Sequence, residues 1–580
     1  MPDIKASVIY QIYPRSFADS NGDGIGDLPG ILSKLNYLAN LGVDVLWLSP
    51  IFQSPNADNG YDISDYEAIM PEFGTMADFD ALLSGVHQRG MRLILDLVVN
   101  HSSDEHRWFR ESRKSKDNPY RDYYIWRGGL PNNWQSFFSG PAWAFDEVTG
   151  DYYLHLFAKK QPDLNWENPA LRQEIYGMMR FWLDKGVDGF RMDVIPFLSK
   201  DTAFPDYPEG RFGDLTIHAN GPRIHEFLQE MHQEVLAHYP NVIAVGEGFG
   251  VSAEQANLYV GARRQELQMI YHFDHAVPRE EHRFLDPAPE FTLPELKAIF
   301  AKWNTALETG LDAPGDASPG WQNIYFGNHD NPRVLSRFGD PERFPYESAT
   351  MLATVLLTQR GTPSLYQGDE IGMSNCPFES IEEYDDIQVR NAWLALSSFA
   401  PDLSQGQQMI KPTDSNQGQQ MIKPTTHSNQ GQQMIKPFLK SANRIARDHA
   451  RTPMQWSAAP LAGFTAGPKT WLKVNPNYAS VNVAQQESDP HSVLNYYRSL
   501  LRWRKKTPAM HTGSYRDLAP DHPSLWAFER VHESGTFVTV ANFSGESVDT
   551  PVEFEGEVVI GNYAGKTGAL EPWEARVYKL

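Results

Sequence analysis

The sequence predicts an α/β fold, a closed (β/α)8 (TIM) barrel with a small subdomain inserted after strand 3 and a C-terminal all-β domain. Two observations predict the barrel. Eight short apolar runs alternate with helix-like segments along most of the 580 residues. The runs are apolar throughout rather than at every second position, which is typical of parallel strands buried on both faces. Eight such units favour a closed barrel, and an open doubly wound sheet is the alternative with the same periodicity.

The expected barrel strands follow one another at intervals that leave room for a helix. In chain order they are Val8–Tyr13, Val43–Ser49, Arg92–Asn100, Gly189–Asp193, Val242–Glu247, Met269–Phe273, Asn323–Asn328 and Pro363–Gln367. The connecting segments carry helical spacing. In Ile31–Leu41 the apolar residues recur on one helix face and Gly42 is a stop signal, so this segment is predicted to be one helix.

Two regions depart from the strand–helix alternation. The interval 101–169 after the third strand is too long for an ordinary loop and is rich in Trp, Tyr, Phe, Asn and Gly, which predicts a B subdomain over one barrel face. Near residue 510 the pattern changes to short strand-like pieces such as Ser524–Arg530, which predicts a β-sandwich over 510–580. The barrel is therefore expected over 1–100 and 170–509.

One segment of the chain repeats itself. The octapeptide QGQQMIKP occurs at Gln405–Pro412, Gln417–Pro424 and Gln430–Pro437, within an insert that spans 405–437. These copies are too short and too polar to stack into a core as solenoid repeats do. Their Gln-rich composition predicts an exposed, expanded loop without chemistry of its own, and a lid over the active site is the alternative.

The composition excludes several classes of protein. The chain carries 51 Lys and Arg against 73 Asp and Glu, and this excess of acid disfavours a nucleic-acid partner, because phosphates are held by cations. The single cysteine, Cys376, excludes an intrachain disulfide and a Cys-rich zinc site. No secretory leader and no membrane-spanning apolar run are recognised. We therefore expect a soluble cytoplasmic protein without a membrane partner, either a monomer or a weak homo-oligomer.

Three acidic residues, Asp193, Glu247 and Asp330, end three of the expected strands or follow them closely. The carboxyl ends of barrel strands converge on one face, where such barrels carry out their chemistry. Glycoside hydrolysis requires one ionised and one protonated carboxyl group in such a place. His101 ends the third strand and Arg191 lies two residues before Asp193, so the set predicts a glycosidase site.

Four segments carry a family resemblance: DLVVNH at Asp96–His101, GFRMD at Gly189–Asp193, GE at Gly246–Glu247 and NHD at Asn328–Asp330. In this order they resemble the four signature regions of the α-amylase superfamily, glycoside hydrolase family 13. YQIYPRSFADSNGDGIGDLPGI, QPDLNWENP, YQGDEIGM and ARTPMQW are similar to segments of its oligo-1,6-glucosidase and α-glucosidase branch. The resemblance runs from about Val8 to Arg504 and implies a barrel, a B subdomain and a β-sandwich C domain.

The resemblance implies a role for each acid. Asp193 is expected to be the nucleophile, Glu247 the general acid/base and Asp330 the stabiliser of the transition state. By opposite charge Arg191 would keep Asp193 ionised, while a less polar, carboxylate-rich setting would raise the proton affinity of Glu247.

The resemblance also implies residues that hold the substrate. His101 and His329 resemble the family's pair of histidines around the first glucose, and Tyr61 and Phe145 would offer aromatic faces to the sugar ring. The alternative for both aromatic residues is a place in the core.

Asp62 and Arg451 resemble the pair that grips the non-reducing end of the terminal glucose. A charged pair that closes this end makes a pocket rather than a cleft, and hence implies exo action on short chains. Val194 directly follows the proposed nucleophile, and branch members that prefer α-1,6 bonds resemble one another in having Val here. Its stiff γ-methyl groups would crowd the nearer sugar of an α-1,4 linkage; packing in the barrel core is the alternative.

A loop near the N-terminus places oxygen-bearing side chains at alternate positions between glycines. It begins like an EF-hand, but Gly30 stands where the bidentate Glu is required, so an EF-hand is rejected. In the resembling enzymes this loop holds a structural divalent ion, usually Ca2+, and a metal-free turn is the alternative. The matching ligands are the side chains of Asp19, Asn21, Asp23 and Asp27 and the carbonyl of Ile25.

Together these features predict a retaining exo-acting α-glucosidase that hydrolyses α-1,6-linked, isomaltose-type oligosaccharides through a covalent glucosyl-enzyme, without an organic cofactor. A sucrose isomerase or another α-glucosyl transferase with the same site is the first alternative. HDNPR at His329–Arg333 resembles sucrose isomerases, whereas an RLDRD-type arginine loop is missing around Glu280–Trp303. A non-catalytic binding protein on the same scaffold is the second alternative, which the presence of all three acids disfavours.

Overall fold

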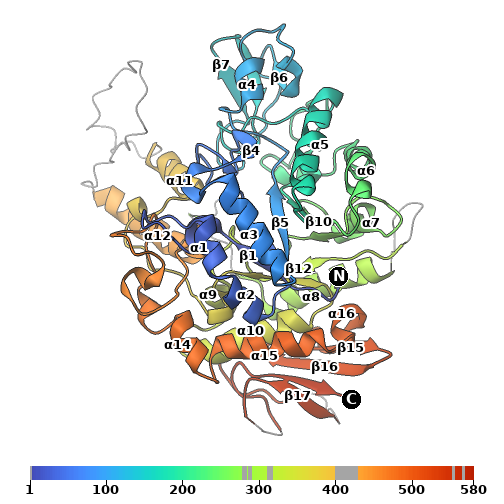
Figure 1. The fold of residues 1–580 in the computed structure, drawn as a ribbon, viewed down its shortest axis with the longest axis vertical. Helices are drawn as coiled ribbons and strands as arrows, with labels where there is room; N and C mark the ends of the chain where they lie inside the picture. Colours follow the sequence, from blue (N-terminus) through green and yellow to red (C-terminus); the bar gives the residue numbers. More distant parts are fainter. Residues whose placement is uncertain are drawn as a thin grey trace.

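The computed structural model describes residues 3–276, 284, 290–309, 318–398, 429–550, 556–564 and 568–580. Figure 1 shows three parts along the long axis: an antiparallel subdomain at the top, the barrel in the centre and a second antiparallel sheet at the bottom. Among the described residues, no helix is long and apolar enough to cross a lipid bilayer.

The centre of the molecule is a sheet of eight parallel strands. They are β1 (Ile9–Ile12), β2 (Val45–Leu48), β5 (Arg92–Leu97), β9 (Gly189–Met192), β10 (Ile243–Glu247), β11 (Met269–Tyr271), β12 (Asn323–Ile324) and β13 (Thr362–Tyr366). Their order is β11-β10-β9-β5-β2-β1-β13-β12, and a parallel bridge between Ile270 and Gln322 joins the two ends. The bridge closes the sheet, so the predicted barrel is confirmed and each predicted strand is present.

Helices cover the outside of the barrel (Figure 1). They include α3 (Met76–Gln88), α5 (Pro169–Asp184), α6 (Ile224–Glu234), α7 (Ala253–Val260), α8 (Leu293–Thr309), α9 (Val334–Phe338), α10 (Pro345–Thr358) and α15 (Val493–Lys505). Shorter or more peripheral helices are α4 (Arg107–Ser112), α11 (Ile387–Ser398), α12 (Asn429–Ile445), α13 (Asp448–Arg451), α14 (Val483–Ser488) and α16 (Ala509–Thr512).

The segment predicted as the single helix Ile31–Leu41 is two helices, α1 (Leu28–Ser33) and α2 (Leu35–Leu41). The one-helix prediction is wrong because Lys34, at φ −103° and ψ 3°, closes α1 with a hydrogen bond to the carbonyl of Ile31. The carboxylate of Asp27 accepts from the N–H of Gly30 and starts α1 earlier than predicted. Gly42 ends α2 in the left-handed conformation, as predicted.

A small antiparallel sheet stands between β5 and α5 in the chain. It contains β6 (Trp126–Arg127), β7 (Trp143–Asp146) and β8 (Asp151–Leu154) in the order β6-β8-β7. Two bridges, His101 with Asp163 and Tyr124 with Leu164, tie the two ends of the segment together. Together with the hairpin of β3 (Phe52–Gln53) and β4 (Asp65–Ile69), this subdomain lies above the barrel in Figure 1.

The C-terminal region forms one antiparallel sheet in the described residues, in the order β14-β15-β16-β18-β17. Its strands are β14 (Ser514–Asp517), β15 (Leu525–His532), β16 (Gly535–Asn542), β17 (Glu557–Gly561) and β18 (Ala575–Lys579). The C-terminal all-β fold is thus confirmed, but the described residues form one sheet there, whereas a sandwich of two sheets was expected.

A buried arginine joins this sheet to the barrel. Arg530 of β15 is fully buried and donates from Nη1 to the carbonyls of Thr358 and Gln359, at 2.8 and 2.7 Å, at the end of α10. Its Nη2 donates to the carbonyl of Gly513 at 2.9 Å. Because α10 leads directly into β13, the bond connects the C-terminal sheet to a barrel strand.

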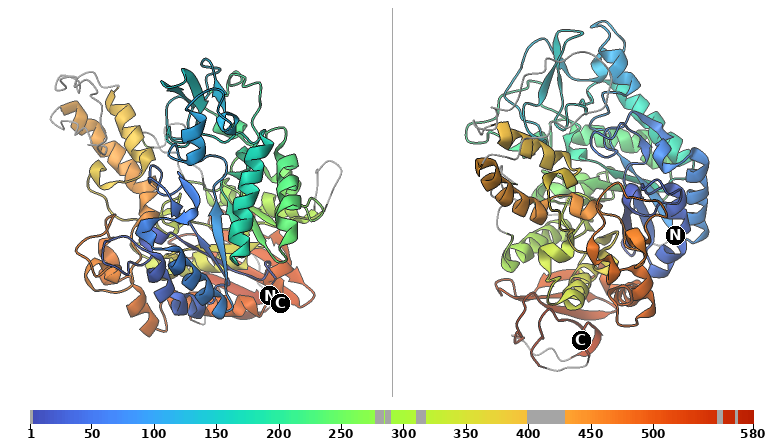
Figure 2. Two further views of the ribbon diagram at one scale, coloured as in Figure 1. Left: turned by 45° about the horizontal axis from the view of Figure 1, so that its top comes forward. Right: turned by 90° about the vertical axis from the view of Figure 1, so that its left-hand side faces the viewer.

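The first two copies of the octapeptide, 405–412 and 417–424, lie outside the described residues. The third, Gln430–Pro437, is part of α12, so the loop prediction is wrong for this copy. Phe438, which follows it, is buried and contacts Trp393 of α11 at 5.3 Å between ring centroids. This apolar contact gives the segment a helical partner: α11 and α12 lie side by side in both views of Figure 2.

Candidate active site

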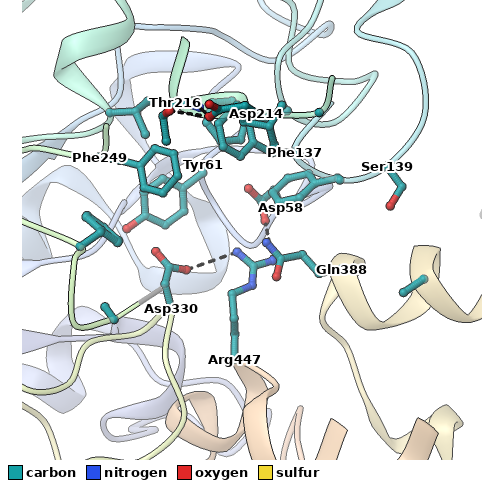
Figure 3. Close-up of a pocket in the computed structure, with 18 of the residues that line it drawn as sticks. Asp58, Tyr61, Phe137, Ser139, Asp214, Thr216, Phe249, Asp330, Gln388 and Arg447 are labelled. Carbon is teal, nitrogen blue, oxygen red and sulfur yellow. Dashed lines mark hydrogen bonds and ion pairs between the residues drawn. The ribbon is translucent and has the colours of Figure 1, made fainter. Parts of the chain in front are cut away.

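The carboxyl ends of the barrel strands open into a cavity of about 930 Å3 (Figure 3). Of the residues predicted from the sequence, those that line it are Tyr61, His101, Asp193, Val194, Glu247, His329 and Asp330. Arg191 and Arg451 are buried behind this wall and contact its carboxylates. The structure therefore gathers most of the predicted set at one place.

The guanidinium of Arg191 contacts three buried carboxylates. Its Nη1 lies 2.7 Å from Oδ1 of both Asp96 and Asp193, and its Nη2 lies 2.7 Å from Oε2 of Glu247. Its Nε donates to the hydroxyl of Tyr271 at 2.8 Å. These side chains meet because β5, β9, β10 and β11 are successive parallel neighbours whose ends point the same way. One cation thus holds the proposed nucleophile and the proposed acid/base side by side.

The carboxyl groups of Asp193 and Glu247 have raised proton affinity. Burial and the charge of Glu247 raise the pKa of Asp193 well above its usual range, against the effect of Arg191. Burial likewise raises the pKa of Glu247. Arg191 opposes this rise at Asp193, as expected of an opposite charge, and because it contacts both acids it opposes the rise in the pKa of Glu247 as well.

The backbone of Val194 is left-handed, at φ 34° and ψ 42°, which is uncommon for a β-branched residue. Its N–H donates to Oε2 of Glu247 at 2.7 Å, and its side chain lines the cavity. The strained turn after Asp193 thus places an amide donor on the carboxyl group of Glu247 and apolar methyl groups at the cavity wall.

Asp330 is held ionised by arginines. Its Oδ1 lies 2.9 Å from Nη2 of Arg451 and 3.2 Å from Nη1 of Arg447, and its Oδ2 lies 3.2 Å from Nε2 of His329. Burial opposes ionisation, but these neighbours lower the pKa of Asp330 well below its usual range. Because burial lowers the pKa of His329 to about 3, the histidine is neutral at neutral pH and the two arginines supply the charge.

A chain of hydrogen bonds fixes the ring of His329. The side-chain N–H of Gln11 donates to Nδ1 at 2.7 Å, which places the ring proton on Nε2. Nε2 lies 2.7 Å from the hydroxyl of Tyr61, which donates to Oδ2 of Asp96 at 2.9 Å. The rings of Tyr61 and His329 are stacked at 5.2 Å with an interplanar angle of 3°. Both rings are therefore held rigidly at the cavity wall.

His101 stands where the inserted subdomain meets the barrel. Its Nε2 lies 3.2 Å from Nε2 of Gln161, whose amide also donates to Oδ2 of Asp58 at 3.2 Å. Burial lowers the pKa of His101 to about 4, so the ring is neutral at neutral pH. The subdomain thereby supplies one wall of the cavity.

A charged pair at the cavity wall is formed by Asp58 and Arg447 (Figure 3). Nη2 of Arg447 lies 3.4 Å from Oδ1 of Asp58, and its Nη1 reaches Asp330. Asp386 holds Arg447 from behind: its Oδ1 accepts from Nε at 3.1 Å and from Nη2 at 2.7 Å. The arginine therefore joins three carboxylates at one end of the cavity.

The predicted pairing of Asp62 with Arg451 is wrong. The buried carboxylate of Asp62 accepts hydrogen bonds at 2.8 to 3.0 Å from its own loop, Ser54–Asp58. Arg451 instead contacts Asp330 and donates to the carbonyl of His329 at 3.0 Å. Asp62 thus shapes the loop that carries Asp58 and does not line the cavity.

The prediction that Phe145 faces the sugar is also wrong. Its side chain is 49% exposed on β7, where it packs against Tyr152 at 5.2 Å and points away from the buried side of the strand. Other aromatic side chains line the cavity: Phe137, Phe138, Phe157, Phe249 and Phe273.

The sequence analysis missed three residues of the charged cluster, Asp58, Arg447 and Asp386. The first two had a signal, since each lies four residues before a predicted residue in the same motif: Asp58 in NADNGYD and Arg447 in RDHAR. Asp386 had none, because it precedes α11 and follows no barrel strand.

The loop Asp19–Asp27 is folded by hydrogen bonds to its own side chains. The carboxylate of Asp19 accepts from Asn21, Gly22 and Gly24, and Oδ1 of Asn21 and of Asp23 each accept from the residue two positions later. Asp27 is buried and accepts from Ser20 and Gly30. Hard oxygen donors on such turns suit Ca2+.

No group of three or more His, Cys, Asp or Glu side chains is gathered closely enough to hold a metal ion, as far as the described residues go. An ion in the loop would therefore need the amide oxygen of Asn21 and the carbonyl of Ile25 as well as the three carboxylates. The donor chemistry fits, while the carboxylates would have to draw together.

Comparison with known proteins places this geometry in a family. The family model for the α-amylase catalytic domain matches residues 11–513. The oligo-1,6-glucosidase of Halalkalibacterium halodurans is 48% identical over 99% of this chain and 98% of its own length. The oligo-1,6-glucosidase of Bacillus cereus is also 48% identical, over 99% of both chains.

Solved structures agree with this placement. The isomaltulose synthase SmuA from Protaminobacter rubrum has a TM-score of 0.89 at 41% identity and covers 100% of this chain and 99% of its own. The trehalulose synthase MutB from Pseudomonas mesoacidophila has a TM-score of 0.87 at 42% identity, with the same coverage. The sequence matches, the closed barrel and the three converging carboxylates agree with one another. The chain belongs to the α-amylase catalytic-domain family and is a glycoside hydrolase.

Proposed function

We propose that the protein is a retaining exo-acting α-glucosidase that releases glucose from α-1,6-linked, isomaltose-type oligosaccharides. The observation that carries the proposal is the contact of Asp193 and Glu247 with one guanidinium, that of Arg191, at the cavity wall. The curated relatives at 47–48% identity over 99% of the chain carry the name oligo-1,6-glucosidase, which supports the choice of linkage.

The separation of the two acids supports retention of configuration. Inverting enzymes keep their carboxyl groups about 6.5–9.5 Å apart to admit a water molecule, whereas retaining enzymes keep them about 5–5.5 Å apart. Asp193 and Glu247 contact the same guanidinium, and their carboxyl groups lie within hydrogen-bonding reach of each other, which leaves little room for water between them. We therefore assign direct attack of a carboxylate on the anomeric carbon.

In the proposed reaction Oδ2 of Asp193, the oxygen not bonded to Arg191, attacks the anomeric carbon of the terminal glucose. Glu247 gives its proton to the leaving glycosidic oxygen, for which its raised pKa suits it. A water molecule then gives a proton back to Glu247 and displaces Asp193, which releases α-glucose. Asp330, held ionised by Arg447 and Arg451, would bind sugar hydroxyls more tightly as the ring flattens.

The charged pair Asp58–Arg447 supports exo action. It stands at the cavity wall beside Asp330, where a terminal glucose bound for attack by Asp193 would present its hydroxyl groups. In this proposal, the salt bridge between Asp58 and Arg447 blocks the end of the cavity beyond the terminal glucose, so no further sugar unit binds there. Only the end of a chain would then reach Asp193.

A second function, sucrose isomerisation on the same site, is favoured by the solved structures of isomaltulose and trehalulose synthases at 41–43% identity. Incubation with isomaltose, maltose, sucrose and trehalose, with chromatography of the products, distinguishes the two. The proposal expects glucose from isomaltose and only glucose and fructose from sucrose. Isomaltulose or trehalulose as the main product from sucrose would replace hydrolysis by transfer.

We also propose that the loop Asp19–Asp27 binds a structural divalent ion, Ca2+ in the first place, and that no organic cofactor takes part. The hard oxygen donors of the loop support this assignment. A cytoplasmic location and a monomeric or weakly self-associating state complete the proposal. The free, buried thiol of Cys376 agrees with a reducing compartment.

A further inference from the structure

A glycine-flanked loop on the cavity wall carries an exposed aromatic ring. Phe212 lines the cavity, yet 59% of it is exposed. Gly210 and Gly213 on either side have φ of 76° and 80°, values that strongly favour glycine. The loop therefore has a backbone that holds a large apolar side chain at the cavity wall rather than in a core.

The ring of Phe212 is supported from below. Tyr207 meets it edge to face, with ring centroids 5.7 Å apart. Tyr207 is itself buried: its N–H donates to Oδ1 of Asn133 at 2.9 Å and its hydroxyl lies 3.2 Å from Nε2 of His218. With 59% of the residue exposed, much of the Phe212 ring remains accessible to a ligand.

Charged groups stand next to the ring on the same loop. Nε and Nη2 of Arg211 donate to Oδ2 of Asp214 at 2.8 and 2.5 Å, and the other carboxylate oxygen accepts from Thr216. Arg211, Asp214 and Thr216 also line the cavity. An apolar ring beside polar groups of this kind suits a sugar, which has an apolar C–H face and a rim of hydroxyl groups.

The loop lies on the leaving-group side of the cavity. Figure 3 places Asp214 and Thr216 across the cavity from Asp330 and Arg447, the closed end that would hold the terminal glucose. Four residues of α11 also line the cavity: the polar Gln388, and Ala392, Ala395 and Leu396, which have small or apolar side chains. The rest of an oligosaccharide would leave the catalytic acids past this loop.

We propose that the loop 210–216 is a second sugar-binding site, in which Phe212 stacks against the second glucose unit beyond the bond that is cleaved. The inference rests on the proposed glucosidase function and deepens it, because it assigns a preference for substrates longer than a disaccharide. The first unit beyond the cleaved bond faces Val194, and the second reaches Phe212.

Steady-state kinetics with isomaltose and isomaltotriose tests this site. Isomaltose has one glucose beyond the cleaved bond and isomaltotriose has two. We expect Phe212→Ala to lower kcat/KM for isomaltotriose about two- to tenfold, the usual effect of an aromatic contact, and to leave isomaltose unchanged. Phe212→Tyr keeps the ring and should keep the wild-type ratio.

Phe145→Ala is the matched control, because Phe145 is another exposed phenylalanine that does not line the cavity. Phe145→Ala should leave kcat/KM unchanged for both isomaltose and isomaltotriose. Equal loss on both substrates in Phe212→Ala, or no loss on either, would overturn the second site while the glucosidase proposal stands. If the wild type cleaves neither sugar, the proposed function fails. The second site is then tested by calorimetric titration with isomaltotriose, which should bind the wild type more tightly than Phe212→Ala; equal affinities would overturn the site.

Discussion

Asp386 binds the guanidinium of Arg447 through one carboxylate oxygen, which accepts from Nε at 3.1 Å and from Nη2 at 2.7 Å. The same oxygen accepts from the N–H of Gln388 and so also begins α11. Arg447 reaches Asp58 and Asp330 with its remaining donors. The orientation of Arg447, which lines the cavity, is therefore set by a residue that does not line it.

Asp386→Asn should weaken substrate binding more than it slows chemistry. Loss of a charge-assisted hydrogen bond costs about 1.5–3 kcal/mol, so we expect KM for isomaltose to rise about tenfold or more with kcat little changed. Asp385→Asn is the control. Asp385 directly precedes Asp386 in the chain, but its carboxylate pairs with Arg390 at the surface. A fall in kcat at constant KM would argue against a positioning role.

Asp193→Asn and Glu247→Gln should each abolish turnover without unfolding the protein. Each removes a reacting group from a buried site that keeps its shape, and losses of this kind are on the order of several kcal/mol in the barrier. Single-turnover kinetics together with a melting curve separates the two effects. An Asp193→Asn protein with more than about a tenth of the wild-type rate would remove Asp193 from the role of nucleophile.

Val194→Thr should shift the linkage preference. The γ-methyl groups of Val194 line the cavity, and apolar crowding of this kind is worth roughly 1–3 kcal/mol, or about 10- to 200-fold in kcat/KM. We expect the wild type to prefer isomaltose over maltose and the variant to gain maltose activity relative to isomaltose. A wild type that already cleaves maltose better would contradict the α-1,6 assignment and leave the retaining mechanism intact.

Asp62 should make the folded state less stable as the pH rises. Burial raises the pKa of Asp62 from its ordinary value of 3.8 to about 6, so the folded protein binds this proton more tightly than the unfolded chain does. The stabilisation is complete below about pH 4 and is lost as the pH rises through 6, by about 3 kcal/mol for a shift of this size.

Denaturant unfolding at pH 4, 5, 6 and 7 of wild type and Asp62→Asn measures this contribution. The asparagine cannot titrate, so the difference in unfolding free energy between the two proteins should change across this range. A constant difference would show that Asp62 titrates alike in both states.

Chelation should lower the melting temperature if the loop Asp19–Asp27 holds an ion. Carboxylates brought together around a cation repel one another once it is removed, so we expect a fall of about 2 °C or more, reversed by added Ca2+. Asp23→Ala, which changes an exposed position of the loop, should remove the response. An unchanged melting curve together with no metal by elemental analysis favours the bare turn.

The barrel could be predicted because eight continuous apolar runs that alternate with helix-like segments are typical of parallel strands buried on both faces. All eight strands lie within the predicted runs or one residue beyond them, and the acids at their ends meet as expected. What the sequence could not give was the choice between like residues in one motif. Asp58 and Asp62 lie four positions apart in the sequence. Only the folded loop shows that the carboxylate of Asp58 faces the cavity, whereas that of Asp62 bonds within the loop.

The sequence also could not predict which way a side chain points on a short strand. Phe145 lies on a four-residue strand with mostly buried neighbours, so no alternating pattern marked it as the outward residue. Asp386 acts through Arg447 from a loop far away in the sequence, and such pairing depends on tertiary packing alone.

The bonds from Arg530 to the carbonyls of Thr358 and Gln359 bear on how the protein unfolds. Removing the C-terminal sheet would deprive the last turn of α10 of these donors and loosen the start of β13, which neighbours both β1 and β12. In the intact protein, the C-terminal sheet and the barrel should therefore unfold in one cooperative transition. A fragment that ends before β14 would fail as an independent enzyme although it contains every residue of the cavity.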